Sequence, residues 1–249
     1  MQIAYQSSTG KVRDKNEDAV GVFKNKHGLI LALITDGIGG NNAGEVASRM
    51  VVTHIGASFE KTAIDTLDGI EGWFEKQLAE ANAAIIDESN TDLRLKGMGT
   101  TIVAALVDGG KSIIANIGDS RGYIYSNQRL FQITEDHSYV NELVKHGDLT
   151  PDQAKNNPYK NIITKSLGIN NDSAADFKSY AVQPNDQILL CTDGLTNMVD
   201  DPEIEKILAR QEPLQAKCNS LVALANQNGG LDNITVLIAK ADSEVKPDE

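Results

Sequence analysis

The chain has 249 residues, of which 41% are apolar and 23% charged, enough for a sizeable core in one large domain or two small ones. Its 35 acidic and 23 basic side chains give a formal net charge of −12, which repels polyanions and argues against a nucleic-acid partner. The first residues show no secretory pattern, and no apolar run approaches the roughly 20 residues that a membrane helix needs. Cys191 and Cys218 form no disulfide or metal pattern, so we expect a protein of the reducing cytoplasm. Because a long apolar run is missing, we expect no membrane partner.

Short segments rich in β-branched residues predict strands, and several segments show helical periodicity. In chain order, the predicted strands cover residues 19–23, 29–34, 101–107, 112–117, 121–125, 186–191 and 233–239. The predicted helices cover residues 43–55, 69–89, 139–146, 202–211 and 214–226. Residues 29–34 and 188–191 are apolar on both alternating faces, which places these strands in a central layer.

The order of these elements favours an α+β fold, with a layered sheet core and outer helices. Tight turns at residues 108–110 and 118–120 predict two β-hairpins. Because no linker or long repeat divides the sequence, we expect a single domain over residues 1–242 and a polar tail over residues 243–249.

Aspartates recur where predicted strands begin or end. Asp36 and Asp193 each follow an apolar strand and precede a glycine, while Asp18, Asp119 and Asp232 lie at other strand borders. Clustered carboxylates repel one another unless a cation neutralises them, and all-oxygen ligation suits Mg²⁺ or Mn²⁺. Asp-Gly is also a common turn dipeptide, but neither copy is followed at once by a second strand, so hairpin turns explain them poorly.

Arg13 lies five residues before Asp18 and allows two interpretations. It could be a surface counter-ion to the acidic residues, or a bidentate clamp on phosphate oxygens. The sequence motifs around Arg13 help to decide between these two interpretations.

Taken in order, these motifs resemble the bacterial form of the type 2C metal-dependent protein serine/threonine phosphatases, from Thr9 to Ala239. The landmarks are Gly10-Lys-Val-Arg13, Asn16-Glu17-Asp18, Asp36-Gly37-Ile38-Gly39-Gly40, Ala43-Gly44-Glu45, Gly97-Met-Gly99-Thr100-Thr101, Gly118-Asp119-Ser120-Arg121, Asp136-His137-Ser138, Thr192-Asp193-Gly194 and Asp232-Asn233-Ile234-Thr235.

The resemblance implies a four-layer α-β-β-α sandwich of two antiparallel β-sheets flanked by helices. It also implies that phosphoserine and phosphothreonine in proteins are hydrolysed by a metal-activated bridging hydroxide at a binuclear Mn²⁺ or Mg²⁺ centre. In this assignment Asp36 bridges both metals, and the Gly37 carbonyl completes the second. Asp193 and Asp232 hold the first metal, and Asp119 joins Asp193 at a third, weaker site.

The remaining implied roles concern the substrate and the water. Arg13 binds the substrate phosphate, while Glu17 and Asp18 act through metal-bound water; Arg13, Asp18 and Asp36 are the implied catalytic residues. By family analogy, the substrates are phosphoproteins and a serine/threonine kinase opposes the enzyme. The region over residues 136–165 corresponds to a flap beside the cleft, and a monomer is the simplest expectation.

Two positions depart from the family pattern. Ile38 and Asn41 stand where relatives carry methionine or histidine, which leaves general-acid assistance to the leaving group open. A non-catalytic domain that recognises phosphoproteins is therefore a second hypothesis, and a two-metal nuclease a third, although the charge of −12 weighs against the latter. Of the four histidines, we expect His137 to orient the loop near it and the others to be structural.

Overall fold

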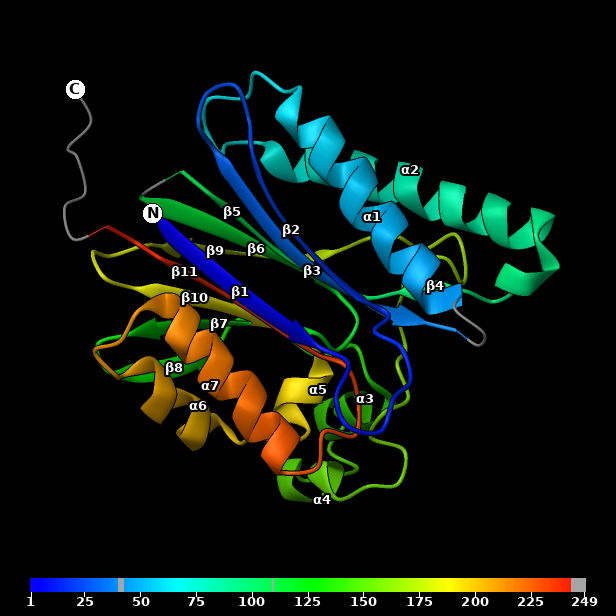
Figure 1. Cartoon of the computed structure of the whole chain (residues 1–249). Coiled ribbons are helices and arrows are strands. Elements are labelled where there is room, and N and C mark those ends of the chain that lie inside the picture. The colour runs from blue at the N-terminus through cyan, green and yellow to red at the C-terminus, as the bar shows by residue number, and fades with distance from the viewer. Residues whose placement is uncertain (40–42, 109, 243–249) are drawn as a thin grey trace.

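Two antiparallel β-sheets pack face to face in the computed structural model, which describes residues 1–39, 43–108 and 110–242 (Figure 1). The first sheet has the order β1 (Gln2–Ser8), β11 (Ile234–Lys240), β10 (Gln187–Cys191), β7 (Arg121–Ser126), β8 (Arg129–Gln132). The second has the order β2 (Asp18–Lys24), β3 (Ile30–Ile38), β5 (Ile102–Val107), β6 (Lys111–Ile117), β9 (Asp176–Ala181), with β4 (Gly99–Thr100) paired to the end of β3.

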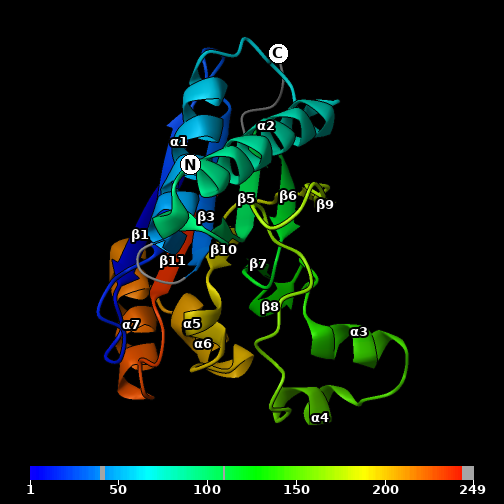
Figure 2. The ribbon, with the colours of Figure 1, turned by 90° about the vertical axis from the view of Figure 1, so that its right-hand side faces the viewer.

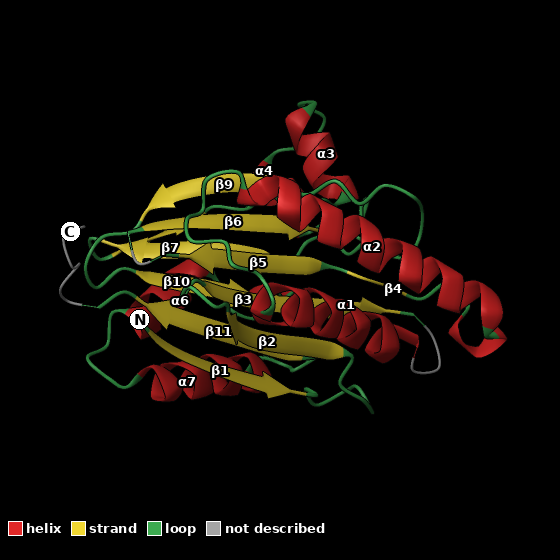
Figure 3. Cartoon of the chain, turned by 90° about the horizontal axis from the view of Figure 1, so that it is seen from above, coloured by secondary structure: helices red, strands yellow, loops and turns green. Residues whose placement is uncertain are grey.

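Helices cover the outer face of each sheet. α1 (Ala43–Glu60) and α2 (Ile70–Thr91) lie over the second sheet, as the view from above shows (Figure 3). α6 (Asp201–Leu208) and α7 (Leu214–Gln227) cover the first sheet. The short η1 (Leu93–Leu95) follows α2, and α5 (Asp193–Thr196) follows β10.

α3 (Tyr139–Lys145) and α4 (Pro151–Lys155) stand apart from these layers and project from the lower end of the molecule in Figure 2. They belong to the segment 136–165 that the sequence predicted as a flap. No helix in the described ranges is long and apolar enough to cross a membrane.

The buried apolar residues form three clusters, one between the two sheets and one between each sheet and its helices. Ile34, Ile124 and Leu190 belong to the cluster between the two sheets. A second cluster joins α1 and α2 to their sheet through residues such as Phe74, and a third joins α6 and α7 to the other sheet through residues such as Leu221. The predicted four-layer α-β-β-α sandwich is confirmed, and the strands apolar on both faces lie in its central layers.

One of the two predicted hairpins is wrong. Pairing of β5 with β6 confirms the hairpin at residues 108–110, of which Gly109 lies outside the described residues. β6 and β7 instead belong to different sheets, so residues 118–120 carry the chain across the sandwich. Gly118 has a φ of 106°, and a Cβ there would lie 2.5 Å from the Thr101 side chain, so the crossing requires glycine.

Several short elements were not predicted. β1, β8 and β9 are strands with mixed burial, and their exposed positions gave them no continuous apolar pattern. β3 also runs past its predicted end through Asp36 and Gly37, because its last residues pair with β4. The predicted polar tail over residues 243–249 lies outside the described residues.

Candidate metal centre and phosphate site

Five aspartates meet at one end of the sandwich, carried there by strands of both sheets. Asp18 on β2 lies directly opposite Asp36 on β3. Asp119 follows β6, Asp193 is the first residue of α5 after β10, and Asp232 precedes β11. The Asp36 carboxyl is close enough to the other four for each to raise its pKa.

Burial and mutual repulsion disfavour ionisation throughout this cluster. Burial, followed by repulsion from Asp18, raises the pKa of Asp36 well above its usual value. Burial is also the main cause that raises the pKa of Asp18 to about 7, of Asp119 to about 8 and of Asp193 to about 6. Repulsion from Asp232 raises the pKa of Asp193 further, so the cluster favours protonated carboxyls, whose protons a cation would displace.

Three oxygen atoms of the cluster are buried and accept no hydrogen bond. They are the Oδ1 atoms of Asp18, Asp119 and Asp193, for which the described residues supply no donor. An unsatisfied buried carboxylate oxygen is costly, and divalent cations that prefer oxygen ligands, with the water that they carry, would supply the missing partners. Although the aspartates are neighbours, no three of the described acidic, histidine or cysteine side chains have the arrangement of a formed metal-binding group, so the ligand assignment stays a prediction.

Arg13 reaches the same cluster from the loop between β1 and β2. Its Nη2 donates to Asp232 Oδ2 at 2.8 Å, and the Asp232 hydrogen bond is the main cause that raises the pKa of Arg13. The Arg13 side chain is 53% exposed, so the guanidinium lies at the rim of the cluster and is open to an incoming ligand. A half-exposed arginine beside a carboxylate cluster is well placed to bind phosphate oxygens.

Gly37 is required for steric reasons that the sequence did not show. A Cβ at residue 37 would lie 2.2 Å from the Gly44 carbonyl oxygen and 2.6 Å from the Glu17 carbonyl oxygen. The Gly37 N–H donates to that Glu17 oxygen, which also accepts from Ser48 Oγ at 2.6 Å. This close packing holds Glu17 and the end of β3 against the start of α1.

Known proteins match this chain over nearly its whole length. The family model described as protein phosphatase 2C matches residues 7–231. The serine/threonine phosphatase stp of Listeria monocytogenes serotype 4b is 42% identical over 243 residues, which cover 97% of this chain and 96% of that protein. The chain belongs to the protein phosphatase 2C family. This confirms the resemblance and the expected enzyme class, a metal-dependent protein serine/threonine phosphatase.

Solved structures of the protein phosphatase 2C family agree with the fold. The Streptococcus agalactiae serine/threonine phosphatase is 39% identical, with a TM-score of 0.92 over 95% of this chain and 98% of that one. The catalytic domain of PstP, solved in complex with two manganese ions, is 32% identical with a TM-score of 0.84 over 97% of this chain and 98% of that one.

Further polar side chains of this phosphatase hold the carboxylates in place. Thr192 Oγ1 and Thr235 Oγ1 both donate to Asp18 Oδ2, at 3.0 and 2.6 Å. Asn197 Nδ2 donates to Asp193 Oδ2 at 2.8 Å. Thr192 and Thr235 lie within the family motifs, one directly before Asp193 and the other three residues after Asp232, and this closeness in sequence was the signal that could have identified them.

Asn233 joins the two chain segments that carry Arg13 and Asp232. Its side-chain oxygen accepts from the Glu17 N–H at 2.8 Å, and its amide donates to the Thr9 and Lys15 carbonyls. The residue next to Asp232 therefore fixes both ends of the segment on which Arg13 stands.

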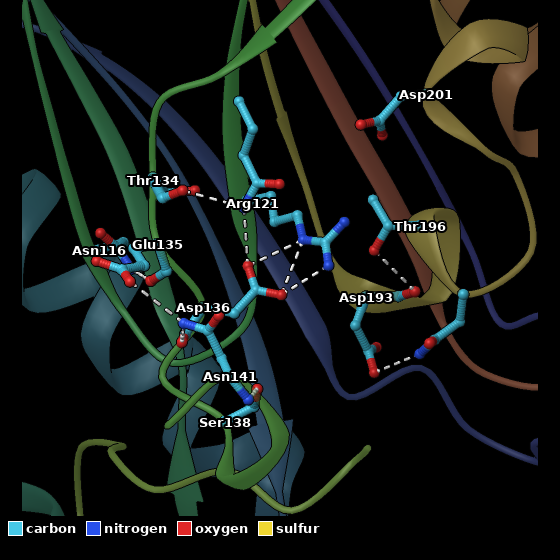
Figure 4. Close-up of polar contacts among 12 residues, drawn as sticks. Asn116, Arg121, Thr134, Glu135, Asp136, Ser138, Asn141, Asp193, Thr196 and Asp201 are labelled. Carbon is cyan, nitrogen blue, oxygen red and sulfur yellow. Dashed lines mark hydrogen bonds and ion pairs between the residues drawn. The ribbon is translucent and has the colours of Figure 1, made fainter. Parts of the chain in front are cut away.

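Arg121 ties the loop after Asp119 to the start of the predicted flap (Figure 4). Its Nε and Nη2 atoms donate to the two carboxylate oxygens of Asp136, with the shortest distance 2.6 Å. Arg121 Nη1 donates to the Tyr123 hydroxyl, and the Asp136 carbonyl accepts from Asn141 on α3. This bidentate ion pair was not predicted, because Arg121 begins β7 and Asp136 lies 15 residues later, beyond the end of β8.

His137 orients the same loop, as the sequence predicted. Its Nδ1 accepts from the Gly118 N–H at 3.0 Å, and its backbone N–H donates to the Gly118 carbonyl at 2.9 Å. The other ring nitrogen of His137, Nε2, lies 3.3 Å from Asp176 Oδ2. His137 therefore contacts the loop that carries Asp119, without contacting a predicted metal ligand itself.

The remaining predictions concern two further histidines and the two positions that depart from the family pattern. His54 on α1 faces Glu80, and His146 ends α3, as expected for structural histidines. Ile38 is the last residue of β3, while Asn41 lies outside the described residues.

Proposed function

We propose that this member of the protein phosphatase 2C family hydrolyses phosphoserine and phosphothreonine in proteins at a binuclear centre of Mn²⁺ or Mg²⁺. The observation that carries the proposal is the group of three buried aspartate oxygens without a hydrogen-bond partner, placed beside the half-exposed Arg13. Two manganese ions in the related PstP structure support the choice of cation.

The residues divide into cation ligands and substrate ligands. Asp36, Asp193, Asp232 and the Gly37 carbonyl would hold the two cations, with Asp36 shared between them. Asp119, together with Asp193, would hold a third, weaker cation. When bound, the two cations supply an acidified water and stabilise the oxygens of an in-line displacement at phosphorus.

The chain itself positions the substrate and the protons. Arg13 binds the equatorial phosphate oxygens with its fork of N–H donors. Asp18 is held at Oδ2 by Thr192 and Thr235, while its Oδ1 has no partner among the described residues. Asp18 and Glu17 would orient water by hydrogen bonding. This proposal needs no covalent phosphoenzyme, in agreement with the two buried cysteines, whose pKa values are raised to about 12.

Several wider assignments belong to the same proposal. Residues 1–242 form one catalytic domain, with the segment 136–165 acting as a flap over protein substrates. A serine/threonine kinase opposes the enzyme, which works as a monomer in the cytoplasm; the free thiols of Cys191 and Cys218 support that location.

The test is phosphate release from a phosphothreonine peptide. We expect release with Mn²⁺, loss of release after thorough chelation, and loss in Asp36→Asn. Asp87→Asn, on an exposed position of α2, is the matched control and should behave as the unmodified protein. Release that persists after chelation, or in Asp36→Asn, would contradict the proposal.

A further inference from the structure

A cavity of about 860 Å³ lies at the opposite end of the first sheet from the carboxylate cluster. It is lined by the start of β10 at Gln187, the end of β11 at Lys240 and the loop between α6 and α7 (on the left in Figure 1). β10 runs from Gln187 to Cys191, just before Asp193, so this distal cavity and the cluster lie at the two ends of one strand.

Three cationic side chains line the distal cavity, and none of them forms an ion pair with any residue in the described ranges. Lys217, Lys240 and Arg210 all contribute to the wall. Two carboxylates, Asp186 and Glu212, also line it, so positive charge exceeds negative charge locally in a protein of net charge −12. Such a site attracts anions although the molecule as a whole repels them.

Lys217 is the most unusual of the three. It is only 4% exposed, and its Nζ donates to Gln187 Oε1 at 3.0 Å and to the Leu208 carbonyl. Both acceptors are uncharged, whereas a buried ammonium is normally paired with an anion because its desolvation is costly. Burial, and then the nearby Lys240, lower its pKa, while Glu212 acts in the opposite direction.

The carboxylates of the wall offset only part of its positive charge, because Asp186 and Glu212 stand against three cations among the described residues. The Asp186 carboxylate already accepts from the Tyr180 hydroxyl and the Gln183 N–H. The N-terminus of the 14-residue helix α7 opens onto the same wall at Leu214, and among the described residues no side chain caps it. Capping of α6 at Leu208 explains one contact of Lys217, but it does not require two further cations on the same wall.

We propose that the distal cavity binds a small organic phosphate, such as a sugar phosphate or a nucleotide. The phosphate oxygens contact Lys217, Lys240 and Arg210, and the hydroxyl groups contact amide side chains of the wall such as Gln183 and Gln187. The volume lies in the range of small-molecule sites and exceeds what inorganic phosphate alone would fill.

The test is calorimetric titration of the full chain with glucose 6-phosphate and with AMP, in chloride buffer containing a chelator. Inorganic phosphate and unphosphorylated glucose are titrated in parallel. We expect at least one organic phosphate to bind more tightly than inorganic phosphate, and glucose not to bind. Lys240→Gln and Arg210→Gln should each weaken binding roughly tenfold, the loss of one charge-assisted contact.

Two further variants separate this site from the rest of the molecule. Lys206→Gln removes the same charge from an exposed position of α6 outside the distal cavity and should leave binding unchanged. Arg13→Ala should also leave it unchanged. Absence of binding by both organic phosphates, equal affinity for inorganic phosphate, or loss of binding in Arg13→Ala but not in Lys240→Gln would each overturn the proposal. These outcomes are independent of the proposed phosphatase reaction, which the chelator abolishes.

Discussion

Arg13 is the residue whose substitution best separates phosphate binding from the carboxylate cluster. Arg13→Ala removes two charge-assisted donors from the substrate, so we expect kcat/KM for a phosphothreonine peptide to fall by roughly 10- to 100-fold. Arg94→Ala, which removes an exposed arginine paired with Asp92, is the matched control and should retain full activity. Steady-state kinetics of both variants measure this, and an unchanged kcat/KM in Arg13→Ala would mean that the residue is only a surface counter-ion.

Thr235 adjusts the proton affinity of Asp18. Its hydroxyl donates to Asp18 Oδ2 and favours the charged carboxylate, so Thr235→Val raises the pKa of Asp18 further. We expect the acid limb of the kcat/KM profile to move to higher pH. Thr235→Ser keeps the donor and should restore the original limb, whereas a shift of equal size in both variants would show that packing, not the hydrogen bond, is responsible.

At the scale of elements, burial on both faces made the central strands predictable, while sheet membership was not. Residues 29–34 and 188–191 are continuous apolar segments, and the structure places them in β3 and β10. The local sequence at residues 118–120 is compatible both with a hairpin turn and with a crossing between the two sheets. The tertiary contacts of Gly118 and Thr101 decide the matter, and these are not visible locally.

The same distinction applies to the site. The aspartates were recognisable because each stands at the border of a predicted strand, next to motif residues. Their supporting contacts were not, since Thr235 meets Asp18 across 217 positions of sequence. Such contacts depend on the pairing of β1 with β11 and on the packing of the two sheets.

The ion pair between Arg121 and Asp136 links two elements and should contribute to stability. Asp136→Ala leaves the largely buried guanidinium without a charged partner, so we expect a loss of about 3 kcal/mol in the free energy of unfolding. Asp92→Ala breaks the exposed pair with Arg94 and should change stability very little. Urea denaturation measures both, and equal effects of the two substitutions would contradict a special role for the buried pair.

At the scale of the whole molecule, the carboxylate cluster makes stability depend on pH when divalent cations are removed. Asp18, Asp119 and Asp193 have folded-state pKa values of about 7, 8 and 6, above the usual value of 3.8. Their contribution is therefore complete below the usual pKa and is lost as pH rises through the folded-state values. In chelator we expect the free energy of unfolding to fall from pH 5 to pH 8.

Saturating Mn²⁺ should reduce or reverse this fall, because a bound cation stabilises the ionised carboxylates and displaces their protons. Denaturant titrations at several pH values, with chelator and with Mn²⁺, measure the difference. Asp119→Asn removes one titrating carboxyl and should flatten the slope in chelator, whereas Asp87→Asn on α2 should leave it unchanged. Identical slopes with and without Mn²⁺ would contradict cation binding at this cluster, since a cation that displaces protons must make its own stabilising effect grow with pH.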